Sequence, residues 1–213
     1  MAERRPIATR NTGWARSLAT SVARTGLTAN AISVLGAVFA LVAGAAFALS
    51  DGPAWRPWLV LAAACIQLRL LCNMLDGMVA VEHGQATAVG ALYNDVPDRI
   101  ADTVILVGAG HAVAAGPWGP TLGWACAVMA MFTAFVRVLG GALGTPQFFF
   151  GPQSKSQRMA VLTGAALLGA VMPHAGWAGR LVGLALVIVL VGSTITVVRR
   201  VLRVAQELRA RGP

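Results

Sequence analysis

Acidic residues of this chain are concentrated in one short window. Five of its eight acidic residues lie between positions 73 and 102, and apolar runs flank that window on both sides. Carboxylates in apolar surroundings are costly to bury, so they need cations, water or a cavity as partners. The window is therefore the place where this sequence could do chemistry. Its acidic residues are Asp76, Glu82, Asp95, Asp98 and Asp102.

The spacing inside the window predicts two helix faces that carry oxygen ligands. Residues three or four positions apart lie on one face of a helix. If two such helices are antiparallel and joined by a short connection, the two faces can meet. Hard oxygen ligands beside small residues favour magnesium, manganese or calcium with a phosphate over zinc. The first face holds Asn73, Asp76, Gly77 and Ala80, and the second holds Gly90, Asn94, Asp98 and Asp102.

A simpler explanation of the same carboxylates stays open. Asp76 or Asp98 could pair with Arg69 or Arg99 only to make burial tolerable. Glu82 could be a solvated helix end. The glycines beside the carboxylates favour a bound ligand, because they let a ligand approach the backbone.

The rest of the sequence predicts an all-α integral membrane protein. The chain has 213 residues, of which 57% are hydrophobic and 12% charged, and its mean hydropathy is +0.70. This composition is too apolar for an ordinary soluble domain. Apolar runs of membrane-spanning length predict a six-transmembrane-helix bundle. The expected spans are 30–49, 57–82, 88–113, 120–142, 157–173 and 177–198.

Short connections between the spans predict one membrane-embedded domain, 1–213. Residues 1–29 are expected to form a cytoplasmic or interfacial segment, 30–198 the six spans, and 199–213 a basic cytoplasmic tail. Trp14, Leu18 and Val22 recur at helical spacing in the first segment. This pattern predicts an N-terminal amphipathic helix that lies in the membrane interface.

The distribution of basic residues predicts the orientation of the chain. Its formal net charge is +9. Lys and Arg gather before the first span, around the fourth connection and after the last span, whereas the opposite connections carry only Arg56 and Arg180. By the positive-inside rule, both termini and the acidic window face the cytoplasm, and we expect a bacterial inner membrane. Basic residues at the ends of apolar segments favour anionic membrane lipids as partners and argue against nucleic acid.

The acidic window resembles the signature of the CDP-alcohol phosphotransferases, a family of membrane enzymes. That signature is an Asp three positions before DGxxAR, followed by eight residues, Gly, three residues, Asp, three residues and Asp. The residues that fall on it are Asp76, Gly77, Ala80, Gly90 and Asp98.

The resemblance extends over most of the chain. Residues 26–33, GLTANAIS, are similar to the start of the family's first span and include Asn30. Arg137 is similar to the family's arginine of the fourth span. Residues 151–159, GPQSKSQRM, are similar to its basic loop before the fifth helix.

This resemblance implies a lipid-synthesising transferase that is usually dimeric. A phosphatidyl group would pass from a CDP-linked lipid, with CDP-diacylglycerol expected, to a small alcohol with release of CMP, in phospholipid biosynthesis. The implied cofactor is a divalent metal, magnesium or manganese. Asp76 and Asp98 would be catalytic, with Asp98 in the place of the general base. The expected binding residues for nucleotide or substrate are Asn30, Gly77, Ala80, Gly90, Asp102, Arg137, Lys155 and Arg158.

The sequence departs from the family pattern at three positions. Asn73 and Asn94 stand where the family has metal-binding Asp, and Val81 stands where it has the motif Arg. Divalent-ion affinity depends on ligand charge, so either a single metal ion or a replacement carboxylate is expected. Pro97 predicts a local bulge that would turn Asp95 toward the site. The expected metal ligands are thus Asn73, Asp76, Asn94, Asp95 and Asp98.

Other functions stay open at this point. A relative that keeps the fold and the lipid cavity without catalysis would be a lipid-binding, nucleotide-binding or scaffolding protein. A transporter could use the acids as a proton or cation relay. Lys155 and Arg158 could bind phosphate, or could be ordinary positive-inside residues. Glycerol phosphate, inositol phosphate, serine, choline and a lipid alcohol all fit as acceptors.

Overall fold

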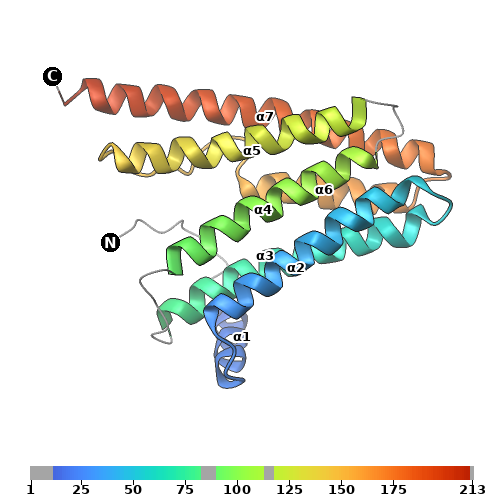
Figure 1. Ribbon diagram of the computed structural model, residues 1–213, viewed down its shortest axis with the longest axis horizontal. Helices are drawn as coiled ribbons and strands as arrows, with labels where there is room; N and C mark the ends of the chain where they lie inside the picture. The colour runs from blue at the N-terminus through green and yellow to red at the C-terminus, as the bar shows by residue number, and fades with distance from the viewer. Residues whose placement is uncertain (1–11, 83–89, 113–117, 212–213) are drawn as a thin grey trace.

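The computed structural model describes residues 12–82, 90–112 and 118–211, which are helical apart from short turns and the longer connection 143–154 (Figure 1). Apolar runs rich in alanine and leucine favour helices of this length. The elements are α1 (Gly13–Arg24), α2 (Ala29–Ala48), the 3₁₀ turn η2 (Leu49–Asp51), α3 (Trp55–Glu82), α4 (Gly90–His111), α5 (Trp118–Ala142), α6 (Lys155–Ala170) and α7 (Ala175–Arg209).

Six of these helices pack into a closed ring. α2 packs against α3 and α4, α4 against α5, α5 against α7, α7 against α6, and α6 against α3. In Figure 1, α5 and α7 lie along one side of the bundle and α2 and α3 along the other. Because α3 and α4 both pack against α2, the acidic residues of α3 and α4 are brought to the same region of the ring.

Glycines allow α2 and α4 to approach closely. A Cβ atom on Gly108 would lie 2.2 Å from the carbonyl oxygen of Gly44, and one on Gly44 would lie 2.6 Å from the carbonyl oxygen of Val104. No side chain fits at either position. Small residues at such contacts let helix backbones pack in lipid, where excluding water contributes nothing. The neighbouring core is apolar and includes Phe47, Ile66, Leu106, Leu162 and Leu186.

The outer surface of the ring is apolar, as expected for a protein that contacts lipid. Many large hydrophobic side chains are exposed on it, whereas soluble monomers rarely expose large continuous apolar patches. Four described helices are long and apolar enough to cross a membrane. The prediction of an all-helical integral membrane protein is therefore confirmed. The four candidate spans are Ala29–Asp51, Trp55–Ala80, Trp118–Ala142 and Ala175–Arg209.

The other two expected spans coincide with α4 and α6. α4 carries Asp95, Asp98, Arg99 and Asp102 within 22 residues, and α6 has only 16 residues. By length and composition, neither of these helices is among the four candidate spans. The six-span arrangement and the single-domain assignment stay predictions.

Both ends of the described chain form helices. α1 lies where the interfacial helix is expected, and its Leu18 and Val22 pack against a buried cluster that includes Met78 of α3, while Trp14 is exposed. Its position at a membrane surface stays a prediction. At the other end, the segment expected as a basic tail continues α7 through Arg209. Good helix formers follow the apolar run there.

Candidate active site

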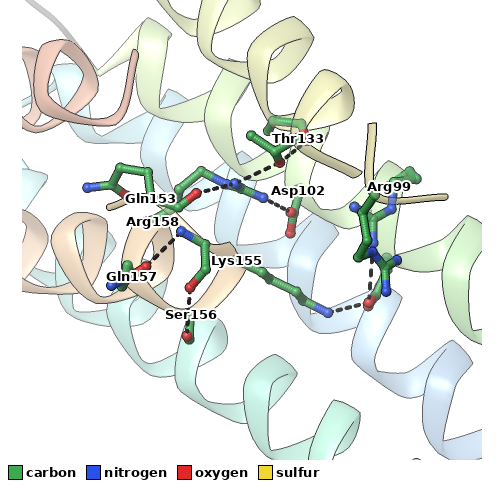
Figure 2. Close-up of polar contacts among 12 residues, drawn as sticks. Arg99, Asp102, Thr133, Gln153, Lys155, Ser156, Gln157 and Arg158 are labelled. Carbon is green, nitrogen blue, oxygen red and sulfur yellow. Dashed lines mark hydrogen bonds and ion pairs between the residues drawn. The ribbon is translucent and has the colours of Figure 1, made fainter. Parts of the chain in front are cut away.

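The charged residues of interest lie at one end of the ring. Asp76 lies near the end of α3, Asp98 and Asp102 lie around the middle of α4, and Lys155 and Arg158 lie in the first turn of α6. The capping box at the start of α6 fixes where that helix begins: the Gln157 side chain accepts a hydrogen bond from the Ser154 amide at 2.8 Å. Figure 2 shows this α6 start beside Asp102.

Asp76 is buried and has an oxygen without a partner. One of its oxygens, Oδ2, accepts a hydrogen bond from the Ser33 hydroxyl of α2 at 2.7 Å. Among the described residues, the other oxygen, Oδ1, has no hydrogen-bond partner, and the same is true of Nδ2 of Asn73, one turn earlier in α3. Buried polar groups are nearly always paired in native proteins. These two orphaned groups therefore point to a ligand.

Asp98 is surrounded by cations. Lys155 forms an ion pair with its Oδ2, Arg69 lies 3.5 Å from Oδ1, and Arg99 lies 3.9 Å from Oδ2. Asp98 also lies near enough to Asp76 for their two charges to interact. The expected convergence of these two carboxylates on a shared metal ion stays a prediction. Pairing of Asp98 with arginines, the simpler explanation, is present.

Asp102 joins three helices through two buried arginines. Arg69 of α3 donates to its Oδ1 at 2.6 Å, and Arg158 of α6 donates to its Oδ2 at 2.9 Å. Arg158 also donates to the Thr133 hydroxyl at 3.2 Å and to the Gln153 carbonyl at 2.9 Å (Figure 2). Both arginine side chains are only 1% exposed. Arg158 therefore serves the packing of the bundle, whatever else it binds.

The buried network extends to α7 through a residue that the sequence analysis missed. Arg200 donates to the Thr133 carbonyl at 2.6 Å and to the Phe150 carbonyl at 3.0 Å. Ser33 was missed as well, because a serine in an apolar run carries no signal of its contact with Asp76. An arginine within an apolar run is a stronger signal of a polar partner, and Arg69 fits that rule.

Asp95 pairs with two arginines, one of which also contacts Asp98. Its Oδ1 lies 3.3 Å from Arg99 and 3.2 Å from Arg137, and its side chain is 46% exposed. The expected bulge is not formed, because Gly90–His111 is a continuous α-helix that contains Pro97. A metal-binding role for Asp95 stays a prediction.

The remaining predicted residues divide into two groups. Asn30 lies in the first turn of α2, and Gly77 and Ala80 follow Asp76 in α3; their role in nucleotide binding stays a prediction. The other group belongs to helix ends whose side-chain surroundings lie outside the described part of the chain. It comprises Val81, Glu82, Gly90 and Asn94.

Lys155 precedes the expected span 157–173, and its charge is disfavoured by its surroundings. Burial and then the positive charge of Arg69 lower the pKa of Lys155, whereas the ion pair with Asp98 acts in the opposite direction, and together they bring this pKa to about 8. The ion pair therefore offsets part of the cost of placing an ammonium group here.

The donor set fits one divalent ion better than a pair. Among the described residues, no group of three or more His, Cys, Asp and Glu side chains could hold a metal ion. Asp76 offers an unpartnered oxygen, and the side-chain carbonyl of Asn73, one turn earlier in α3, is a neutral oxygen of the kind that such ions accept. Asp98 can bind a metal ion only if it gives up its ion pair with Lys155. A single ion at Asp76 and Asn73 is what these residues suit.

Comparison with known proteins identifies the fold. No family model matches the sequence, and no curated protein matches it. Solved structures do match: phosphatidylinositol phosphate synthase of Mycobacterium tuberculosis with CDP-DAG bound has a TM-score of 0.73 and 22% sequence identity, over 89% of this chain and 92% of that chain. The chain therefore has the fold of this membrane-lipid synthase.

Two further structures of the same mycobacterial synthase agree. The complex with manganese and citrate has a TM-score of 0.74 at 22% identity, over 89% of this chain and 88% of that chain. The apo form has a TM-score of 0.69 at 23% identity, over 87% and 93%. These likenesses agree with the resemblance to CDP-alcohol phosphotransferases that the acidic window carries.

Proposed function

We propose that this chain is a CDP-alcohol phosphatidyltransferase that uses CDP-diacylglycerol as donor and a small alcohol as acceptor, with release of CMP. The observation that carries the proposal is the buried carboxylate of Asp76, which keeps one unpartnered oxygen and lies near enough to Asp98 of the neighbouring helix for their charges to interact. The fold supports it, since the mycobacterial synthase of the same fold has been seen with CDP-DAG bound.

The roles of the residues follow from their chemistry. Asp98 accepts the proton of the acceptor hydroxyl as that oxygen attacks phosphorus and CMP leaves. Asp76 and Asn73 would hold magnesium or manganese, which supplies positive charge to the diphosphate of the donor when bound. Gly77 and Ala80 leave room for the nucleotide. Before it can act as base, Asp98 must be freed from Lys155.

Basic side chains around the carboxylates suit anionic substrates. Arg99 and Arg137 are each about one-fifth exposed and lie next to the half-exposed Asp95, so they can exchange that partner for a phosphate oxygen. Arg158 is buried and paired with Asp102, and it acts by holding α4 and α6 in place. We place this end of the bundle and both termini on the cytoplasmic side of a bacterial inner membrane, in a homodimer.

A CMP-release assay tests this function. The purified protein is given CDP-diacylglycerol and, in turn, glycerol phosphate, inositol phosphate, serine, choline and a lipid alcohol, with magnesium or manganese or with a chelator. We expect metal-dependent CMP release with one acceptor class and its loss in Asp76→Asn. Asp51→Asn is the matched control, because Asp51 is exposed at the opposite end of α2.

The second candidate is a lipid-binding relative without transferase activity. The substitutions at Asn73, Asn94 and Val81, together with the cations around Asp98, favour it. Its distinguishing result is binding of CDP or CDP-diacylglycerol without CMP release for any acceptor.

A further inference from the structure

We infer that Lys155 is a built-in cation of the site: its ammonium group holds the position at Asp98 that a second divalent ion would need, so that the protein binds one divalent ion instead of two. The inference deepens the proposed function and rests on it. It concerns the metal content of the site, which can be measured without substrate.

Both oxygens of the Asp98 carboxylate already have cationic partners. Lys155 forms an ion pair with Oδ2, and Arg69 lies 3.5 Å from Oδ1, so both carboxylate oxygens already face a positive charge. The side chains of Asp98 and Lys155 are only 13% and 15% exposed. A divalent ion at Asp98 would have to displace the lysine or lie beside it, and two positive charges at such short range repel strongly in a protein interior.

The ion pairs around the site contain more positive than negative side chains. Among the described residues, one connected set of ion pairs contains three carboxylates and five cationic side chains. Its excess positive charge disfavours added cations and favours an anionic diphosphate. Asp76 is outside this set and keeps an unpartnered oxygen, so it is where one divalent ion still fits. The set comprises Asp95, Asp98, Asp102, Arg69, Arg99, Arg137, Lys155 and Arg158.

Lys155 differs chemically from the other basic residues of the chain. It is the only lysine of the chain, and every other basic residue of its 17 is an arginine. An ammonium group is a compact charge with three donors, unlike the planar guanidinium, and so is the better substitute for a small cation. A cation at the start of a helix is disfavoured by the helix dipole, so Lys155 gains from the carboxylate of α4 rather than from α6 itself.

The position of Lys155 is fixed by its neighbours in α6. The capping box of Ser154 and Gln157 sets the helix start, and Arg158, one turn from Lys155, is tied to Asp102 of α4. Asp98 and Asp102 lie one turn apart on α4. Two successive contacts therefore join the same faces of α6 and α4, and the lysine is held against Asp98.

Counting bound manganese tests the inference. Equilibrium binding of Mn²⁺ to the purified full-length protein, read by electron paramagnetic resonance of the free ion, should give one ion per chain. Lys155→Met should give two, because Asp98 is then open. Lys155→Arg keeps the charge and should stay at one. Two ions in the unaltered protein, an unchanged count in Lys155→Met, or no binding by either protein would overturn the inference.

A second measurement avoids substitutions that could disturb folding. Reductive methylation with ¹³C-formaldehyde labels only Lys155 and the terminal amine, since no other lysine exists. Saturating Mg²⁺ should leave the Lys155 methyl resonance in place, and a shift to the position of a free lysine would contradict the inference. If CMP release fails while these results hold, the transferase proposal fails and the built-in cation stands.

Discussion

Arg158, at the start of α6, donates a hydrogen bond to the Asp102 carboxylate of α4 at 2.9 Å, although 56 positions separate them. Arg69 of α3 contacts the other oxygen of the same carboxylate at 2.6 Å. One acidic side chain thus compensates two buried arginines from two helices. The start of α6, and with it Lys155, depends on that carboxylate for its place beside α4.

Asp102→Asn should destabilise the protein strongly. The amide keeps the shape but removes the carboxylate partner of Arg158 and leaves Arg69 with only its longer contact to Asp98, and breaking a buried ion pair costs about 3–5 kcal/mol. Thermal unfolding in detergent would measure this loss. Glu207→Gln is the control, because its pair with Arg203 is solvent-exposed and contributes at most about 0.5 kcal/mol. Equal effects of the two substitutions would contradict a structural role for Asp102.

Ser33→Ala should weaken the site at Asp76. Its hydroxyl is the donor to Asp76 Oδ2, and leaving a buried acceptor unpaired costs about 1–3 kcal/mol. We expect a lower unfolding temperature and altered manganese affinity. Ser21→Ala changes helix propensity equally, but removes only an exposed bond to the Ser17 carbonyl. A manganese affinity unchanged from that of the control would disprove the link to Asp76.

Gly108→Ala should disrupt the contact of α2 with α4. The added carbon would lie 2.2 Å from the Gly44 carbonyl oxygen, and relieving such overpacking costs about 1–3 kcal/mol or more. Gly164→Ala is the matched helical control, since nothing lies within 4 Å of its added carbon, and we expect a gain of up to about 1 kcal/mol. Unfolding temperatures of the two variants that move in the same direction would refute the close contact.

Stability should rise between about pH 8 and the ordinary pKa of lysine. The pKa of Lys155 is lowered to about 8 in the folded protein, with burial as the largest cause, while an unfolded lysine titrates near about 10.4. Over this range the unfolded chain binds more protons than the folded one, so the free energy of unfolding increases with pH. Lys155→Met should flatten this increase in chelator-treated protein. An identical dependence of stability on pH in the variant would contradict the assignment of this effect to Lys155.

The positions of the helices could be predicted from the sequence because burial in lipid requires long apolar runs. The expected spans 30–49 and 120–142 begin and end within two residues of α2 and α5. The end of α7 could not be predicted this way. Hydropathy falls at Arg199 and Arg200, although helix propensity continues and Arg203 pairs with Glu207.

The site could be predicted in part, for a physical reason. The spacing of Asp76, Asn73 and Asp98 determines which of them share a helix face, and this is local information. The contacts of Asp98 with Lys155 and of Asp76 with Ser33 join residues far apart in the chain. They depend on the order of helices around the ring, which composition and periodicity do not determine. The role of Arg158 in packing was hidden for the same reason.

The final turns of α7 brace the connection that leads into α6. Arg200 donates to the Phe150 carbonyl, and Arg211, just beyond the helix, donates to the Gly144 carbonyl at 2.8 Å. The C-terminal part of the chain therefore contacts the connection 143–154 at two points, Gly144 and Phe150. A chain truncated after residue 198 would keep every apolar turn needed to enter a membrane. It would lose both of these contacts, and with them the support of the connection that places Lys155 beside Asp98.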